Sequence, residues 1–131
     1  MSEPVFLSLQ EILFLHERSI ARYGGTLGIR DQSGLDAAAN HPLNVWFYMH
    51  GDVFDIAAAY MFHIAEAQAF LDGNKRTAVA AGLNFLAANN IELNFDAGLL
   101  YEAMIKIGTR RMSKAELAAE LRNQSKGSSG Q

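Results

Sequence analysis

The chain has 131 residues, of which 50% are hydrophobic and 19% charged, and its formal net charge is −3 at pH 7. This length fits one compact domain that can fold without disulfides or a structural metal. The absence of cysteine excludes a disulfide scaffold, a thiolate metal site and a cysteine nucleophile. The acidic balance argues against a protein that mainly coats nucleic acid. No apolar run approaches the roughly 20 residues that span a bilayer, and no secretory leader pattern is present, so we expect a soluble, cytoplasmic protein.

The composition predicts an all-helical fold, because helix-forming residues are abundant and only two prolines interrupt the chain. The first helix should begin at Ser8, where Ser8 and Glu11 fit a capping box, and stop before Tyr23-Gly24-Gly25. A glycine-rich turn follows over 24–34. A short helix over 34–40 should then end at the His41-Pro42 step, since the residue before proline is pushed away from α geometry.

The middle of the chain predicts a buried pair of helices. Residues 54–70, preceded by Asp52 as a cap, are apolar on almost every side, and a second apolar helix should run over 74–88. The other predicted elements are at most one short edge strand or hairpin at 91–95, a helix at 97–107 and a helix from the capping box Ser113–Glu116 to Asn123. We therefore expect about six helices around a central pair, in a single domain over 1–124 with a disordered polar tail over 125–131.

The turn between the two central helices is strongly polar. Gly73 permits a tight bend, and the N–H groups of the next three residues, Asn74, Lys75 and Arg76, open a helix without intrahelical acceptors. Lys75 and Arg76 add positive charge, and Asp72 supplies a carboxylate suited to Mg²⁺. These residues favour a site for a magnesium–nucleotide polyphosphate. The alternative is an ordinary solvated helix start, with Asp72 as a cap.

The same stretch resembles the signature of the Fic/Doc superfamily, His-x-Phe-x-(Asp/Glu)-Gly-Asn-(Gly/Lys)-Arg. The matching residues are Phe70, Asp72, Gly73, Asn74, Lys75 and Arg76. Fic proteins proper usually have glycine at the position of Lys75. With lysine there, the sequence resembles the death-on-curing (Doc) branch. Segments 22–25, 28–31 and 34–38 also resemble the Doc N-terminal region, and the likeness covers about residues 5–120.

This resemblance implies a Fic-type helical bundle that uses ATP or another NTP with Mg²⁺. A Doc-like toxin would modify a hydroxyl of a translation factor, and phosphorylation of elongation factor Tu is favoured over AMP transfer. By the same resemblance, Asp72 would coordinate Mg²⁺, Phe70 would anchor the loop, and the phosphates would be held by Gly73, Asn74, Lys75 and Arg76. The superfamily's self-inhibitory pattern, (Ser/Thr)-x-x-x-Glu-(Gly/Asn), has no match here. A small antitoxin protein that supplies an inhibitory helix is therefore the implied partner.

The sequence departs from the signature at Gln68, which stands where the family has its general-base histidine. A glutamine amide cannot take a proton near neutral pH, and loss of a general base costs roughly 10²–10⁴-fold in rate. His63 lies about 140° around the helix from Gln68 and should be a core histidine. Three explanations of Gln68 remain open: a natural variant with weaker or altered chemistry, a natural pseudoenzyme, and a substitution made to allow production of a toxic protein. We expect impaired transfer, and the alternative is an inactive protein that regulates by binding nucleotide or antitoxin.

Two other features allow more than one interpretation. The aromatic stretch 46–49, in a predicted loop, is similar in position to the superfamily's target-binding flap, but it is equally consistent with a lid on the core. Direct nucleic-acid binding through Lys75, Arg76, Arg110 and Arg111 is the least favoured function, because the chain is acidic.

Overall fold

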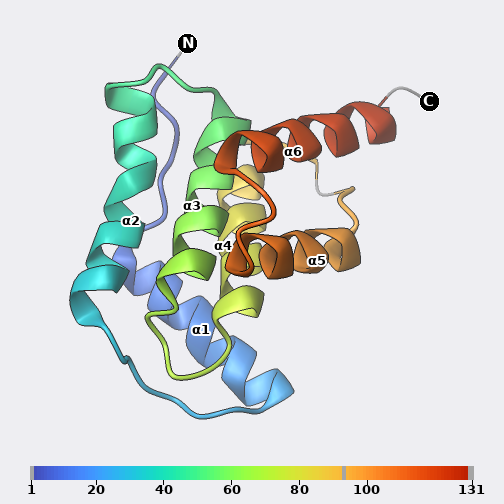
Figure 1. The fold of residues 1–131 in the computed structure, drawn as a ribbon. Coiled ribbons are helices and arrows are strands. Elements are labelled where there is room, and N and C mark those ends of the chain that lie inside the picture. The colour runs from blue at the N-terminus through green and yellow to red at the C-terminus, as the bar shows by residue number, and fades with distance from the viewer. Residues whose placement is uncertain (1, 93, 130–131) are drawn as a thin grey trace.

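The computed structural model describes residues 2–92 and 94–129 of the chain, which form six α-helices and no strand (Figure 1). The helices are α1 (Leu9–Tyr23), α2 (Gln32–Phe47), α3 (Val53–Ala67), α4 (Asn74–Ala88), α5 (Ala97–Gly108) and α6 (Lys114–Ser129). Helix α3 lies at the centre and packs against α2, α4, α5 and α6. The predicted all-helical bundle is confirmed. In the part of the chain described, no helix has the length and apolar character needed to cross a membrane.

Helices α3 and α4 form the predicted central pair. Ile56, Tyr60 and Ile64 of α3 and Phe85 of α4 belong to one core and are almost fully buried. The two helices approach closely at Gly82, where a side chain would collide with Met61. The loop that joins them is therefore anchored at both ends in the core of the domain.

The start of α1 follows from local sequence. The Ser8 hydroxyl accepts a hydrogen bond from the Glu11 N–H at 3.1 Å, and the Glu11 carboxylate accepts one from the Ser8 N–H at 2.9 Å. This is the predicted capping box. The helix ends at Tyr23, and Gly24 follows with φ of 87°, a left-handed region that favours glycine.

Helix α2 is longer than the 34–40 segment predicted, because it continues through Pro42 to Phe47. Leu35, Ala38, Pro42 and Val45 recur at three- and four-residue spacing and are all buried. This continuous apolar face packs on α3 and offsets the hydrogen bond that proline cannot donate. The aromatic stretch 46–49 is consequently split between the last turn of α2 and the turn after it, not placed wholly in a loop.

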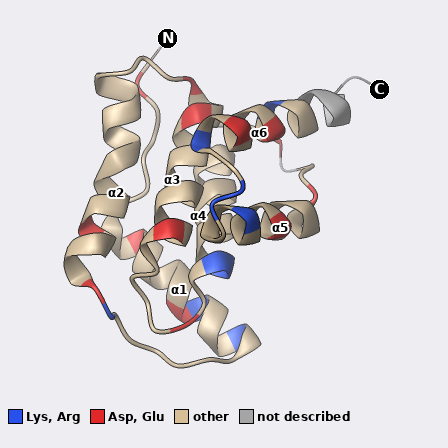
Figure 2. Cartoon of the chain, in the orientation of Figure 1, with Lys and Arg blue, Asp and Glu red and all other residues tan. Residues whose placement is uncertain are grey.

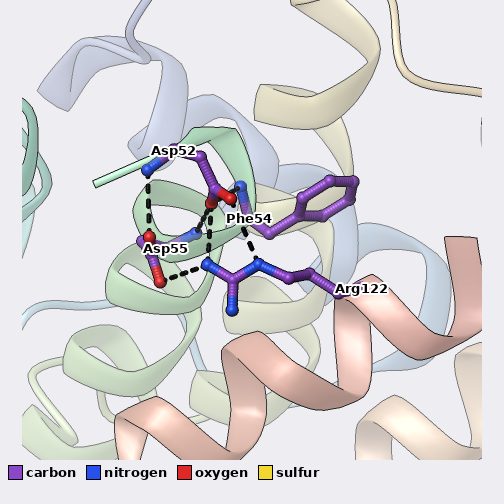
Figure 3. A network of polar contacts seen from close by, with 4 residues as sticks. All are labelled: Asp52, Phe54, Asp55 and Arg122. Atoms are coloured by element: carbon purple, nitrogen blue, oxygen red, sulfur yellow. Dashed lines mark hydrogen bonds and ion pairs between the residues drawn. The ribbon is translucent and has the colours of Figure 1, made fainter. Parts of the chain in front are cut away.

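A polar network fastens α6 to the start of α3 (Figure 3). Asp52 caps α3 in a capping box with Asp55, and Arg122 of α6 reaches both carboxylates, at 2.9 Å and 2.7 Å. Burial alone would raise the pKa of Asp52, but the hydrogen bonds from Arg122 and the Asp55 backbone together lower it. The sequence predicted the Asp52 cap but not its partner seventy residues away.

The C-terminal region differs from expectation in two places. Helix α6 opens at the predicted Ser113–Glu116 capping box but extends to Ser129, whereas a disordered tail was predicted over 125–131. Where the extension begins, the Gln124 side chain donates a hydrogen bond to the Glu120 carboxylate and accepts one from the Asp96 N–H. Residues 130–131 lie outside the described residues. The edge strand predicted at 91–95 is not formed by its described residues, and Leu93 lies outside them.

Tyr60 ties the N-terminal segment to the core, and Tyr60→Phe should be destabilising. Its buried hydroxyl accepts a hydrogen bond from the Leu7 N–H at 2.8 Å and donates one to the Leu7 carbonyl at 3.0 Å, and burial raises its pKa to about 12. Phenylalanine leaves two buried main-chain groups unpaired, so the free energy of unfolding should fall by roughly 1–3 kcal/mol. Urea denaturation followed by circular dichroism measures the loss. An unchanged midpoint would contradict this role.

His63 makes stability depend on pH. Burial, followed by the nearby Lys114 and His41, lowers the pKa of His63 to about 3, and Lys114 Nζ lies 3.0 Å from its Nε2. Because the unfolded histidine takes up a proton near pH 6.5 and the folded one does not, stability is complete above that pH and falls as pH drops towards 3. The melting temperature should therefore be lower at pH 5 than at pH 7.5. His63→Gln should reduce this difference, while the exposed His50→Gln should preserve it.

Candidate functional site

The candidate site is the loop 68–73 that joins α3 to α4. Gln68 ends α3 in the left-handed region, with φ of 46°, and Gly73 opens α4 with φ of 77°. Between them, Ala69 and Phe70 are buried while Leu71 and Asp72 are exposed. The chain thus turns twice over a short distance, and the first three residues of α4, Asn74, Lys75 and Arg76, are half-buried.

Asn74 locks this loop from inside. Its side-chain oxygen accepts a hydrogen bond from the Phe70 N–H at 3.0 Å, and its amide nitrogen donates to the Phe70 carbonyl at 3.0 Å. Because both polar atoms of the side chain bind the Phe70 backbone, the amide closes the loop. The part of Asn74 that remains open to an anion is its main-chain N–H.

A second segment, residues 24–31, runs beside the loop, and we call it the strap. Ile29 and Phe70 form an isolated antiparallel bridge, and the Leu71 N–H donates to the Gly28 carbonyl at 3.0 Å. At Gly28, with φ of 138°, a side chain would collide with Leu71 at 2.7 Å. The strap therefore needs glycine at position 28 to lie this close to the loop.

His16 of α1 is buried against the inner side of the loop. The side chain is only 2% exposed, its ring stacks on Phe70 with 3.7 Å between ring centroids, and its Nε2 lies 2.8 Å from the Asp72 carbonyl oxygen. Since a carbonyl oxygen can only accept, Nε2 donates this bond. The predicted anchor Phe70 is thus buried between the core and His16.

Beside the loop is a cleft of about 220 Å³, which we call the cation cleft. Its lining residues are Arg30, Ala65, Gln68, Leu71, Asp72, Gly73, Asn74, Lys75, Arg76 and Tyr101. Within the described chain, none of its three cations forms an ion pair with an acidic residue. Figure 2 shows basic residues on the first turn of α4 and on α1. The cleft therefore gathers positive charge in a chain of net charge −3.

Arg76 reaches from α4 across to the end of α1. Its Nε donates to the Ser19 hydroxyl at 3.0 Å, its Nη2 donates to the Gly24 carbonyl at 3.1 Å, and its guanidinium lies 5.4 Å from the centre of the Tyr23 ring. Guanidinium carries five N–H donors, so further donors stay available. The contacts with α1 fix the orientation of the charge at the wall of the cleft.

The arrangement is chemically suited to an anion. The N–H groups of Asn74, Lys75 and Arg76 have no intrahelical acceptor, and no side chain caps this end of α4. The helix dipole adds partial positive charge at the same point. The four residues predicted to hold phosphates, Gly73, Asn74, Lys75 and Arg76, all line this cleft.

Asp72 is the acidic residue of this cleft. Its Oδ2 accepts a hydrogen bond from the Thr26 N–H of the strap at 2.8 Å, and the residue is exposed. In the described residues, no group of three metal-ligating side chains is present. A magnesium ion at Asp72 would therefore take its other ligands from phosphates and water, the arrangement that Mg²⁺ commonly adopts.

None of the chain's four histidines, all within the described residues, lines the cleft. His63 of α3 stacks on His41 of α2 and contacts Lys114 of α6. His16 is closest to the loop but is buried beneath it. The exposed Gln68 side chain therefore stands at the cleft without a histidine to replace it.

Sequence reasoning missed His16, Arg30 and Tyr101 as parts of this site. His16 lies within the first predicted helix and Arg30 within the segment 28–31, and neither position by itself indicates a site residue. Tyr101 enters from α5 and lines both the cation cleft and a neighbouring groove. No pattern within a single segment marks these residues, since each is brought in by packing of a distant element.

The neighbouring groove, which we call the α1–α4–α5 groove, has a volume of about 500 Å³. Its lining residues are Leu15, Arg18, Ser19, Arg22, Tyr23, Arg76, Val79, Ala80, Leu83, Asn84, Ala97 and Tyr101. It combines an apolar floor with arginines at its edge, and Arg76 and Tyr101 are common to it and the cation cleft. Arg110 and Arg111, on the connection between α5 and α6, line neither.

Comparison with known proteins shows the family of this chain. Residues 6–86 match the model of the Fic/DOC family, and this range includes the strap, the loop and nearly all of α4. The chain is 32% identical over 117 residues to "Protein kinase doc" of Escherichia phage P1, covering 88% of this chain and 92% of that protein. It is also 37% identical over 103 residues to "Toxin Doc" of Mycolicibacterium smegmatis, covering 76% of this chain and 79% of that protein. The chain therefore belongs to the Fic/DOC family, among relatives of the Doc type.

Proposed function

We propose that the cation cleft binds a magnesium–nucleoside triphosphate and that the chain is a Doc-type toxin whose transfer reaction is weakened by Gln68. The observation that supports this most directly is the convergence of unpaired helix N–H groups, Lys75, Arg76 and Asp72 on one cleft. The names of its relatives, a protein kinase and a toxin, favour transfer of phosphate to a protein.

The charged residues at the start of α4 and Asp72 each have a defined task in this proposal. The main-chain N–H groups at the start of α4 bind phosphate oxygens, with Arg76 and Lys75 neutralising their charge. Asp72 would hold Mg²⁺, which shields the phosphates when bound. Phosphoryl transfer relies mainly on positioning and charge stabilisation, so the cleft retains most of what the reaction needs. The missing part is the group that takes the proton from the attacking hydroxyl.

Calorimetric titration of the unmodified protein with ATP and magnesium tests nucleotide binding. Saturable heat at a stoichiometry near one is expected, together with a dependence on magnesium. Incubation with elongation factor Tu and ATP labelled at the α- or γ-phosphate tests the reaction, and slow transfer of the γ-label is expected. Transfer of the α-label alone would replace phosphorylation by AMP transfer.

A second candidate function is favoured by Gln68 itself. Without a general base, the protein could bind nucleotide or a partner and act as a regulator with no turnover. The first proposal requires nucleotide binding at the cation cleft, and the second allows it. They differ in catalysis: any labelled target that accumulates with time, and does so only with this protein present, excludes the inactive regulator.

We also propose an antitoxin helix as the occupant of the α1–α4–α5 groove. Leu15, Val79 and Leu83 provide an apolar floor, and Arg18 and Arg22 stand at its edge without an acidic partner in the described chain. An amphipathic helix with an acidic margin fits this pattern. The product of a small adjacent reading frame should bind and lower ATP affinity through the shared Arg76. Arg18→Glu with Arg22→Glu should weaken that binding, and an unaltered affinity would remove the groove from the proposal.

A further inference from the structure

Arg30 lies outside the signature segment, yet it reaches the cation cleft. It belongs to the strap, and its Nη2 donates to the Gln68 carbonyl at 2.6 Å, while its main-chain N–H donates to the Ala69 carbonyl, also at 2.6 Å. It is exposed and lines the same cleft as Lys75 and Arg76. Two separate segments of the chain thus deliver positive charge to one cleft.

The hydrogen bonding of Arg30 leaves it able to bind a ligand. Of the five N–H donors of its guanidinium, the structure uses one, at the Gln68 carbonyl. No acidic residue of the described chain forms an ion pair with it, although Asp31 is its neighbour in sequence. A guanidinium with free donors can grip phosphate oxygens through two parallel bonds, which an ammonium group cannot do.

The contact of Arg30 with Gln68 also supports an unusual backbone conformation. Gln68 is a non-glycine residue with φ of 46° and ψ of 45°, a backbone state that needs support from its surroundings. The Gln68 carbonyl, at the exposed end of α3, accepts a hydrogen bond from the Arg30 side chain. Arg30 therefore lines the cleft and also contacts Gln68, the residue at the position of the family's general-base histidine.

We propose that Arg30 is a further phosphate-binding residue of the cation cleft, which holds the polyphosphate at the Gln68 end and fixes the Gln68 backbone. The inference rests on the proposed nucleotide binding. Three cations then surround the ligand, with Arg30 on the strap and Lys75 and Arg76 on α4. The binding site extends beyond the signature segment, and the strap is part of it.

Calorimetry with three variants tests this role, using magnesium with either ATP or tripolyphosphate as the probe. Arg30→Gln should weaken both by roughly 10-fold, because a charged hydrogen bond to phosphate is lost. Arg30→Lys should fall between it and the unmodified protein, since it keeps the charge but loses the fork. The affinity of Arg30→Gln should also depend less on salt, which a purely structural loosening would not cause. Arg110→Gln, on the exposed α5–α6 connection, is the matched control and should bind like the unmodified protein.

The outcomes separate this inference from the proposed function. If the unmodified protein binds ATP and Arg30→Gln, folded by circular dichroism, binds equally well, Arg30 is not a ligand residue while the nucleotide site stands. If the unmodified protein binds neither probe, the proposed function and this inference both fail. If Arg30→Gln does not fold, Arg30→Lys decides, and an affinity equal to that of the unmodified protein overturns the inference.

Discussion

Gln68→His is expected to increase the rate of group transfer by roughly 10²- to 10⁴-fold. Gln68 lines the cation cleft and is exposed, so its side chain is accessible to an incoming hydroxyl. An imidazole there can take the proton that the glutamine amide cannot accept. In the proposed function the start of α4, Lys75 and Arg76 hold the phosphates, so one substitution would add the missing proton acceptor without rebuilding the site.

The backbone should accept this change. Gln68 has φ of 46°, and histidine is among the few non-glycine residues enriched in this left-handed region. Because the side chain at 68 is exposed, the larger ring needs no rearrangement of the core. We therefore expect the melting temperature of the variant to match that of the unmodified protein, and its ATP affinity to change little.

Single-turnover transfer of γ-labelled phosphate to elongation factor Tu measures the effect. Gln68→Asn is the matched control: asparagine also tolerates the left-handed backbone but has no usable basicity, so it should not accelerate the reaction. The rate for Gln68→His should rise with pH through the imidazole pKa, because only the neutral ring accepts a proton. Transfer of neither label by Gln68→His, despite normal ATP binding, would remove the toxin-like transferase from consideration.

Local sequence was sufficient for most helix boundaries and failed where packing of distant residues decides. The capping boxes at Ser8 and Ser113 depend on residues three positions apart, and the structure confirms both. Pro42 is the opposite case: its local tendency to end a helix is outweighed by burial of the α2 face against α3. That compensation depends on a neighbouring helix and has no signal in the residues around Pro42.

The same division holds for the site. The turn at Gly73 and the helix start at Asn74 follow from one contiguous stretch, and the structure has both. His16 and Arg30 reach the loop from α1 and the strap, so only the tertiary fold reveals them. Asn74 shows a further limit of the sequence pattern, because both polar atoms of its side chain bind the Phe70 backbone. A residue type at a fixed spacing predicts a site, but not which of its atoms remain free.

Arg76→Ala should weaken ATP binding by roughly 10- to 100-fold, the loss expected for hydrogen bonds between a charged donor and phosphate. Arg76 lines the cation cleft and is held in place by Ser19 and Gly24. Alanine removes the charge along with these contacts, so the variant alone does not separate binding from positioning.

Ser19→Ala supplies that separation, because it removes the hydrogen bond to Arg76 Nε and leaves the guanidinium present. It should weaken ATP binding by only a fewfold, whereas Arg110→Ala should leave binding unchanged. Calorimetry with ATP and magnesium, at two salt concentrations, measures all three affinities. The effect of Arg76→Ala should shrink as salt increases, since exposed charges are screened. Equal affinities for Arg76→Ala and Arg110→Ala would mean that positive charge at the cleft does not hold the phosphates, and the α4 helix start would then be ordinary surface.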